Sequence, residues 1–231
     1  MRKLAFGLMA ASLTLFAKDG VEVTHRLDDA TTTFNEIMAA PDHGIPHDLL
    51  EKAHCVVVVP GLKKGAFVVG AEFGRGFISC RRAEDRGWSA PAAIRMEGGS
   101  FGFQIGGSET DAVLLVMSDH GAERLMGDQF TLGGEGEVAA GPVGRETTAQ
   151  TDARFTAEIL SWSRSRGVFA GISLKGATLR QDKDANADLY GHPLTTREVV
   201  MGHEAHPTEA GRRFIAALSL ESYREHGSHG Q

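Results

Sequence analysis

Apolar residues near the start of the chain recur at the spacing of an amphipathic helix. Residues 19–40 carry apolar side chains at three- and four-residue steps, which places them along one side of a helix. The stretch PDHGIP (41–46) ends this helix, and Pro46 can begin a short second helix through Lys52. The apolar stripe consists of Val23, Leu27, Phe34 and Ile37.

The pattern then changes from helical spacing to runs that are typical of strands. Residues 54–60 (HCVVVVP) are mostly β-branched and apolar, as expected of a strand that is buried on both faces. Further strands are predicted at 65–73, 74–82, 88–96, 100–107, 111–117, 153–164 and 167–174. Short helical segments are predicted at 119–127, 195–202 and 208–222.

Strands that follow one another closely, with few helical crossovers between them, favour antiparallel pairing. We therefore predict an α+β fold in a single domain over residues 18–222. Its core is antiparallel and β-rich, sandwich-like or barrel-like, with N-terminal and C-terminal helices. Residues 223–231 are predicted to form a flexible tail.

The first 17 residues have the composition of a secretory signal peptide. Arg2 and Lys3 precede an apolar run from Leu4 to Ala17. At about 1.5 Å per residue this run is too short to cross a bilayer core of about 30 Å. We predict cleavage after Ala17 and a periplasmic or secreted mature protein, with a buried N-terminal helix as the alternative.

The two cysteines, Cys55 and Cys80, both lie in apolar, strand-like runs. Export would permit a disulfide between them. A buried free thiol would instead behave as a small hydrophobic side chain. The sequence leaves both possibilities open, because it does not show whether the two residues are close enough to bond.

The stretch GGSFGFQIGG (98–107) contains the pattern Gly-x-Ser-x-Gly, which is typical of the nucleophile elbow of serine hydrolases. An elbow needs a strand, a sharp turn that carries the serine, and then a helix. Ser100 is followed instead by alternating residues, with three glycines in seven positions. We therefore interpret the stretch as a glycine-rich strand that other elements can approach closely. A serine hydrolase that uses Ser100 is kept as an alternative.

The distribution of charge excludes one class of function and indicates a candidate site. The formal net charge of −6 argues against a general nucleic-acid binder, which needs a basic face. Basic residues nevertheless gather between residues 61 and 86, where they can attract phosphate by charge and by hydrogen bonding. The candidate phosphate-binding residues are Lys63, Lys64, Arg75, Arg81 and Arg82.

Acidic and amide side chains alternate between residues 182 and 188, like the start of a calcium-binding loop. An EF-hand needs Gly at the sixth position and Glu at the twelfth, where this chain has Ala187 and Pro193. A turn that hydrogen-bonds to itself is therefore the preferred interpretation, with another kind of calcium loop as the alternative. No firm metal site and no cofactor are predicted. The weak candidate ligands are Asp182, Asp184, Asn186 and Asp188.

Five stretches, taken in order, resemble the SYLF domain, also called the Ysc84-type or DUF500 domain. They are AHCVVVVPGLKKGAFVVGAEFGRGFISCR, GWSAPAAIRMEGGSFGFQIGGSETDAVLLVM, LGGEGEVAAGPVGRET, EILSWSRSRGVFAGISLKGATLRQD and ANADLYG. The resemblance covers about residues 25–200. It implies lipid binding and brings no catalytic residues with it.

The resemblance also implies what to expect of partners. Eukaryotic SYLF proteins bind phosphoinositides and some bind actin, whereas bacterial ones are mostly exported single-domain proteins. The eukaryotic proteins contact membranes through an N-terminal amphipathic helix with basic neighbours, but the corresponding helix here has an acidic polar face. We therefore expect phospholipids or a membrane surface as the partner, and we expect neither nucleic acid nor actin.

Together these observations predict a non-enzymatic, exported bacterial protein that binds phospholipid head groups or acyl chains at the cell envelope. In this hypothesis the clustered cations attract phosphate, and the apolar stripe either inserts at the membrane interface or packs on the core. The alternative is an envelope structural or interaction protein without a lipid site. Its protein partner would bind an exposed edge strand or the N-terminal helix.

Overall fold

The computed structural model describes residues 5–40, 44–66, 69–82, 87–101, 106–134, 137–141, 157–165, 168–170 and 174–222. Within these residues the helices are α1 (Ala5–Met38), α2 (His47–Lys52), α3 (Asp119–Leu125), α5 (Lys183–Tyr190), α6 (Thr196–Met201) and α7 (Glu209–Glu221). The strands are β1 (Cys55–Ala66), β2 (Val69–Cys80), β3 (Ala92–Phe101), β4 (Gly106–Val116), β5 (Gln129–Thr131), β6 (Val138–Ala140), β7 (Ile159–Ser165), β8 (Val168–Ala170) and β9 (Thr178–Gln181).

All nine strands of the described residues belong to one sheet, in the order β5-β9-β3-β2-β1-β4-β7-β6, with β8 paired to β7. Every pairing is antiparallel except that of β6 with β7. Phe130 and Val138, from the two ends of this order, belong to the same core cluster, so the sheet curls into a half-barrel. The predicted α+β fold with an antiparallel, barrel-like core is confirmed.

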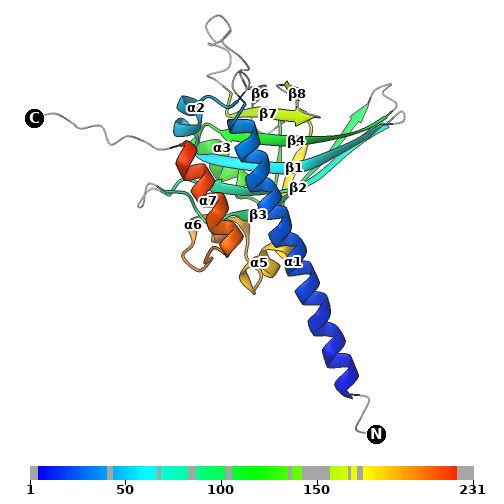
Figure 1. The fold of residues 1–231 in the computed structure, drawn as a ribbon. Coiled ribbons are helices and arrows are strands. Elements are labelled where there is room, and N and C mark those ends of the chain that lie inside the picture. The colour runs from blue at the N-terminus through cyan, green and yellow to red at the C-terminus, as the bar shows by residue number, and fades with distance from the viewer. Residues whose placement is uncertain are drawn as a thin grey trace, which may run out of the picture.

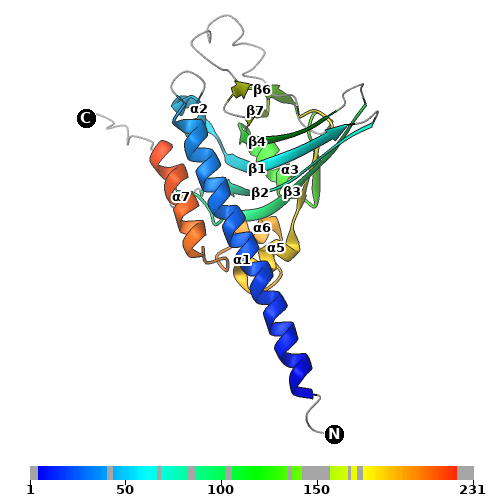
Figure 2. The ribbon, with the colours of Figure 1, turned by 45° about the vertical axis from the view of Figure 1, so that its right-hand side comes forward.

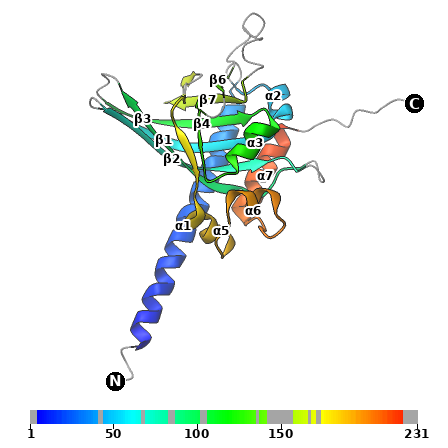
Figure 3. The same cartoon turned by 180° about the vertical axis from the view of Figure 1, so that it is seen from behind.

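Helices cover both faces of the sheet (Figures 1 and 3). On one face, α1 and α7 lie over a core cluster that contains Phe34 and Phe214. On the other face, α3 and α6 lie over a second cluster that contains Leu125 and Val199. The central strand β1 contributes alternate residues to the two clusters, as predicted for an apolar run buried on both faces.

Helix α1 crosses the sheet diagonally with α7 beside it (Figure 2). Its apolar stripe faces the sheet, and Leu27 and Phe34 are fully buried. Arg213 of α7 donates a hydrogen bond of 2.7 Å to Asp28 of α1, which ties the two helices together. The helix predicted over residues 19–40 is therefore confirmed, although α1 begins earlier and its first turns project beyond the rest of the domain.

The predicted break between two strands at residue 74 is wrong. Strand β2 runs without interruption through Gly74, which the sequence had suggested as the start of a new strand. A Cβ atom at this position would lie 2.6 Å from Val59 Cγ1 and 2.8 Å from Leu62 Cδ1. The glycine therefore serves the close approach of β1 side chains and does not form a turn.

Other strand boundaries also differ from the prediction, since β1 continues beyond residue 60 to Ala66. Strand β3 begins at Ala92, four residues later than predicted. The strand predicted at 100–107 is divided between the end of β3 and the start of β4, and residues 102–105 lie outside the described part of the chain. The glycine-rich sequence alternates like a strand on both sides of the connection between β3 and β4. Periodicity alone therefore does not show where β3 ends and β4 begins.

Cys55 and Cys80 form a disulfide, which answers the question that the sequence left open. The two residues lie directly opposite each other in the register of β1 and β2, and their Cα atoms are 3.9 Å apart. Both are buried in the core. Antiparallel pairing thus brings together two positions that are 25 residues apart in the sequence.

Candidate functional site

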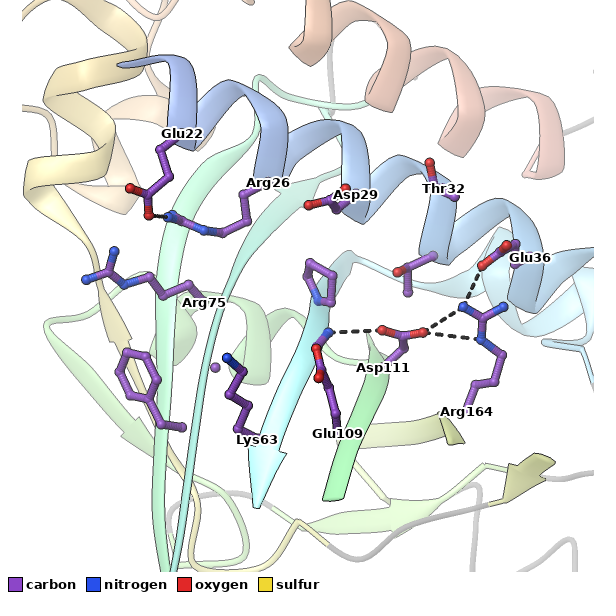
Figure 4. Close-up of a pocket in the computed structure, with 15 residues that line it drawn as sticks. Glu22, Arg26, Asp29, Thr32, Glu36, Lys63, Arg75, Glu109, Asp111 and Arg164 are labelled. Carbon is purple, nitrogen blue, oxygen red and sulfur yellow. Dashed lines mark hydrogen bonds and ion pairs between the residues drawn. The ribbon is translucent and has the colours of Figure 1, made fainter. Parts of the chain in front are cut away.

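A groove of about 530 Å³ lies between α1 and the sheet, where the long strands pass beyond the helix (Figure 4). Pro60, Gly61, Phe73 and Gly74 form part of its floor. Most of the remaining lining consists of charged side chains from α1, β1, β2, β4 and β7. These are Glu22, Arg26, Asp29, Glu36, Lys63, Arg75, Glu109, Asp111 and Arg164.

A bulge in β1 shapes the floor of the groove. The registers with β2 and β4 both shift around Pro60 and Gly61. Gly61 has φ +57°, a left-handed conformation that glycine adopts without strain. Its N–H donates a hydrogen bond of 2.9 Å to Asp111 Oδ1. The bulge is therefore held in place by a carboxylate from the neighbouring strand β4.

Arg164 of β7 joins three elements at one end of the groove. It donates hydrogen bonds of 2.7 and 3.2 Å to Asp111 Oδ2, and its Nη2 lies 2.5 Å from Glu36 of α1. Burial alone would lower the pKa of Arg164, but the hydrogen bonds to Asp111 and Glu36 raise it overall. This cluster is therefore a fixed ionic connection between α1 and the sheet.

Lys63 stands in the middle of a row of side chains on the groove side of the sheet. Its cross-strand neighbours are Phe73 on β2 and Glu109 on β4, and directly opposite residues share a face. All three side chains are exposed, and Phe73 is 45 % exposed despite its size. Within the described residues Lys63 forms no ion pair. The row presents a cation, an aromatic ring and a carboxylate to solvent.

The structure separates the five basic residues that the sequence grouped together. Lys63 and Arg75 both line the groove, where the guanidinium of Arg75 lies 5.9 Å from the ring centre of Phe73. Lys64 instead forms an ion pair of 2.8 Å with Glu72.

Arg81 and Arg82 lie at the opposite end of β2, where they hold backbone in place. Arg81 donates hydrogen bonds to backbone oxygens that include that of Ser222, and it stacks over Trp88 at 4.3 Å. Arg82 donates to Gly202 O at 2.7 Å. Because six residues of strand span about 20 Å, neither can act together with Arg75 on one small ligand.

The apolar stripe of α1 packs on the core, which is the second of the two roles that the sequence allowed. Val23, Leu27, Phe34 and Ile37 are at most 4 % exposed. They lie in the cluster between α1, α7 and the sheet. In this arrangement their side chains are covered by the protein itself.

Residues 183–188 lie in helix α5, which Asp182 caps, so the predicted turn or calcium loop is wrong in its backbone conformation. Asp182 is the N-cap of α5 and accepts a hydrogen bond from Ala185 N–H. Asn186 is fully buried, whereas Asp184 is exposed on the first turn. The side chains therefore diverge around a helix, and no cluster of three metal-ligating groups occurs in the described residues.

Ser100 lies within β3, where its backbone pairs with Gly70 of β2. The next element in the described chain is another strand, β4, which begins at Gly106. A nucleophile elbow would place a helix there. The strand interpretation of this part of the glycine-rich stretch is confirmed.

Several residues of this region were not singled out from the sequence. Asp111 and Arg164 are 53 residues apart, and no local pattern links them. Arg95 of β3 lies opposite Arg75 in the sheet register, and Arg180 of β9 lies opposite Arg95. The alternation of charged and apolar residues in IRME and in TLR would have shown which face Arg95 and Arg180 occupy, but not which residues of other strands lie next to them.

In the part of the chain that the structure describes, none of the helices is long and apolar enough to span a bilayer.

The protein is a single-domain α+β protein. Its curled antiparallel sheet lies between two layers of helices, and a polar groove opens beside the N-terminal helix. Residues 97–220 match the family model Ysc84, described as "Las17-binding protein actin regulator". The chain belongs to this Ysc84 (SYLF) family, as the resemblance in its sequence implied.

Curated proteins of the same family confirm the relationship over most of the chain. The SH3 domain-containing YSC84-like protein 1 of Rattus norvegicus is 35 % identical over 180 residues, which are 77 % of this chain and 52 % of that protein. The human protein of the same name is 34 % identical over 198 residues, or 84 % and 57 % of the two chains. LAS seventeen-binding protein 3 of Saccharomyces cerevisiae is 34 % identical over 199 residues, or 85 % and 42 %. The chain spans about half the length of the curated relatives it matches.

Proposed function

We propose that this chain is a non-enzymatic protein that binds phospholipid head groups, and that the groove beside α1 is its headgroup site. The observation that carries the proposal is the exposed pair of cations, Lys63 and Arg75, both next to the exposed ring of Phe73. Lysine offers a compact charge and arginine a planar set of donors, and both suit a phosphate. The SYLF resemblance, which implies lipid binding, supports the same reading.

The balance of charge in the groove favours a headgroup of low net charge. Its lining carries four basic and five acidic side chains. Arg26 pairs with Glu22 at 2.9 Å and Arg164 with Asp111, whereas Arg75 has only a long contact of 3.9 Å with Asp182. A headgroup with several phosphates would meet the remaining carboxylates, whereas a single phosphodiester could bind the two cations and place a cationic end near Glu109.

We further propose that the protein is exported in a bacterium and acts at the cell envelope, with residues 1–17 removed. The charged and apolar pattern of the N-terminus supports export. Val23 is the first buried residue in the part of α1 whose burial is described, from residue 20 onwards, and it lies six positions beyond Ala17. This cleavage would therefore leave the stripe from Val23 to Ile37 intact. Mass spectrometry of the protein recovered from outside the cytoplasm tests the proposal, because an intact Met1 there would contradict it.

Sedimentation with vesicles tests the groove. Vesicles of phosphatidylethanolamine and phosphatidylglycerol are pelleted with the wild type, with Lys63→Glu and with Lys52→Glu. Lys52 on α2 is 64 % exposed and outside the groove, so its variant makes the same charge change elsewhere. We expect a several-fold loss of pelleting for Lys63→Glu alone. Equal loss in both variants would show a general charge effect, and no pelleting of the wild type would refute lipid binding.

A second candidate function is binding to a protein partner at the envelope, without a lipid site. The description of the family as Las17-binding and as an actin regulator favours this candidate. The exposed apolar side chains Met201 and Leu220, 60 % and 77 % exposed, are candidate contacts on α6 and α7. We do not propose actin itself, since an exported protein would not meet it. Cross-linking in cells that captures one protein, together with no pelleting by any vesicle, would favour this candidate.

A further inference from the structure

Three arginines lie side by side across three neighbouring strands. Arg75 of β2 is directly opposite Arg95 of β3, and Arg95 is directly opposite Arg180 of β9. Directly paired residues of an antiparallel sheet point to the same face, and neighbouring strands are about 4.8 Å apart. The three guanidinium groups therefore form a row, which we call the arginine row, on the face of the sheet that carries α1.

This arrangement is electrostatically unfavourable unless something negative lies over it, because like charges directly opposite each other destabilise a sheet. The protein supplies only part of that charge. Asp182 lies 3.9 Å from both Arg75 and Arg95, and Glu97 lies 3.4 Å from Arg180. Within 4 Å, three cations thus face two carboxylates, at distances longer than good charge-assisted hydrogen bonds. Glu22, Asp184 and Asp188 also line the pocket of Arg75 and Arg95, but none of them forms an ion pair with the row in the described residues.

The hydrogen-bond donors of the arginine row are also unpaired within the described residues. None of its three guanidinium groups donates a hydrogen bond there, and Arg95 Nε is buried without a partner. Arg164 and Arg213, by contrast, each donate several hydrogen bonds to carboxylates. A buried donor without a partner is uncommon in folded proteins and calls for a ligand or an ordered water.

The arginine row is open to solvent. The side chains of Arg75, Arg95 and Arg180 are 43 %, 36 % and 45 % exposed. Arg75 and Arg95 also line a second pocket, of about 210 Å³, between α1 and α5. A small ligand can therefore reach several guanidinium groups at once.

We propose that the arginine row is a binding site for an oxyanion, namely the phosphate group of a phosphomonoester or phosphodiester. Parallel N–H groups of a guanidinium match two oxygens of a phosphate, and adjacent strands bring a second guanidinium to the same group. The ligand carries one phosphate and not a chain of them, because Asp184 and Asp188, which also line the second pocket, repel further negative charge.

This site goes beyond the proposed groove. Arg75 lines both regions, whereas Arg95 and Arg180 lie outside the groove. The phosphate could come from a lipid headgroup that lies across the sheet or from a free phosphate ester. The chemistry that recognises it is the same in both cases.

Thermal unfolding with inorganic phosphate as the probe tests the site. The melting temperature is measured in 20 mM phosphate and in chloride of matched ionic strength, for the wild type, Arg180→Gln, Arg75→Gln with Arg95→Gln, and Arg197→Gln. Arg197 on α6 is 52 % exposed and provides the same charge change away from the row. We expect phosphate to raise the melting temperature of the wild type and of Arg197→Gln by at least about 2 °C. This rise should be lost in the other two variants.

The design allows for a variant that folds poorly. Removing Arg75 and Arg95 together takes away the cations within 4 Å of the buried Asp182, so that variant can lose stability for structural reasons. Among the described residues Arg180 pairs only with the surface residue Glu97, so Arg180→Gln should fold normally. No phosphate response in the wild type, or an equal response in Arg180→Gln and Arg197→Gln, would overturn the proposal.

A second experiment, with phosphatidylglycerol vesicles, distinguishes a lipid headgroup from a free phosphate ester as the source of the phosphate. If 20 mM phosphate stabilises the protein and also releases it from phosphatidylglycerol vesicles, the site takes a lipid headgroup. If phosphate stabilises the protein without releasing it, the site takes a free ester. Pelleting without any phosphate response would refute only the arginine-row site. A phosphate response without pelleting would refute only the lipid-binding function.

Discussion

The side-chain amide of Asn186 joins α5 to the backbone of β3. Its Oδ1 accepts a hydrogen bond of 2.7 Å from Ala93 N–H, and its Nδ2 donates one of 3.0 Å to Leu194 O. Asn186 is fully buried, so neither backbone group has water as a substitute partner. The amide therefore fixes both the start of β3 and the loop that leads into α6.

Replacing this amide should destabilise the domain. Asn186→Ala leaves one backbone donor and one backbone acceptor buried without partners, which we expect to lower the free energy of unfolding by about 1–3 kcal/mol. Urea unfolding followed by circular dichroism measures the change. Asp184→Asn, on the exposed side of the same helix, serves as the control. Equal stability of Asn186→Ala and wild type would show that the amide is not an anchor.

The carboxylate of Asp111 should be needed for the bulge in β1. Asp111→Ala removes the acceptor for Gly61 N–H and for Arg164, so we expect the free energy of unfolding to fall by about 1–3 kcal/mol. Glu109→Gln is the matched control, since the Glu109 carboxylate forms no ion pair with the described residues. A similar loss in both variants, measured by urea unfolding, would argue against a specific role for Asp111.

The apolar stripe of α1 should contribute to stability, as its burial indicates. Phe34→Ala empties a fully buried site between α1 and the sheet, and we expect it to lower the free energy of unfolding by about 3–5 kcal/mol. Thr32→Ala, on the groove side of the same helix, should change it by less than about 1 kcal/mol. A Phe34→Ala protein as stable as the wild type would mean that α1 does not pack on this face in solution.

Reduction of the disulfide should lower stability through the unfolded state. Opening a loop between positions 25 apart should reduce the free energy of unfolding by about 3 kcal/mol. Thermal unfolding with and without dithiothreitol measures the effect. A variant with both Cys55→Ala and Cys80→Ala should show no response to dithiothreitol. Two titratable thiols in the untreated, denatured wild type would contradict the bond.

The start of α6 should respond to acid. The backbone N–H and hydroxyl of Thr195 donate to Glu198 at 2.8 Å each, and these hydrogen bonds lower the pKa of Glu198. Because the folded-state pKa lies below the unfolded one, the stabilisation is complete above the unfolded pKa of about 4.3. It is lost as the pH falls through the folded-state value.

A pH series of urea unfolding between pH 6 and pH 3 tests this assignment. We expect the wild type to lose more stability over this range than Glu198→Gln, which keeps the cap without a titrating group. Glu204→Gln changes an exposed carboxylate outside α6 and should behave like the wild type. Identical pH profiles for the wild type and Glu198→Gln would contradict the role of the carboxylate.

Long periodic segments could be predicted from the sequence because the spacing of their apolar residues reflects which faces of the helix or strand are buried in the protein. The stripe of α1 and the apolar run of β1 each record burial directly, and both were identified correctly. The conformation of residues 182–188 was predicted wrongly because alternating acidic and amide residues are common in turns. Asp182 is instead a helix cap, and the residue that matters most, Asn186, acts through backbone partners from distant segments.

The candidate site was only partly visible before the fold was known. Lys63 and Arg75 were named from a cluster of charge, but Arg81 and Arg82 share that cluster and hold backbone at the other end of β2. Position along a strand decides between these roles, because six residues separate the two ends of the cluster by about 20 Å. Whether a ligand can reach these basic side chains depends on which helices cover each end of β2.

The sequence by itself determined the family, the α+β class and the amphipathic character of α1, because each depends on residue types and their spacing along the chain. Only the tertiary structure decided that Cys55 meets Cys80, that Asp111 holds the bulge of β1, and that Arg75, Arg95 and Arg180 form one row. The reason is register: antiparallel pairing brings together residues far apart in sequence, and no local pattern specifies which residue lies opposite which.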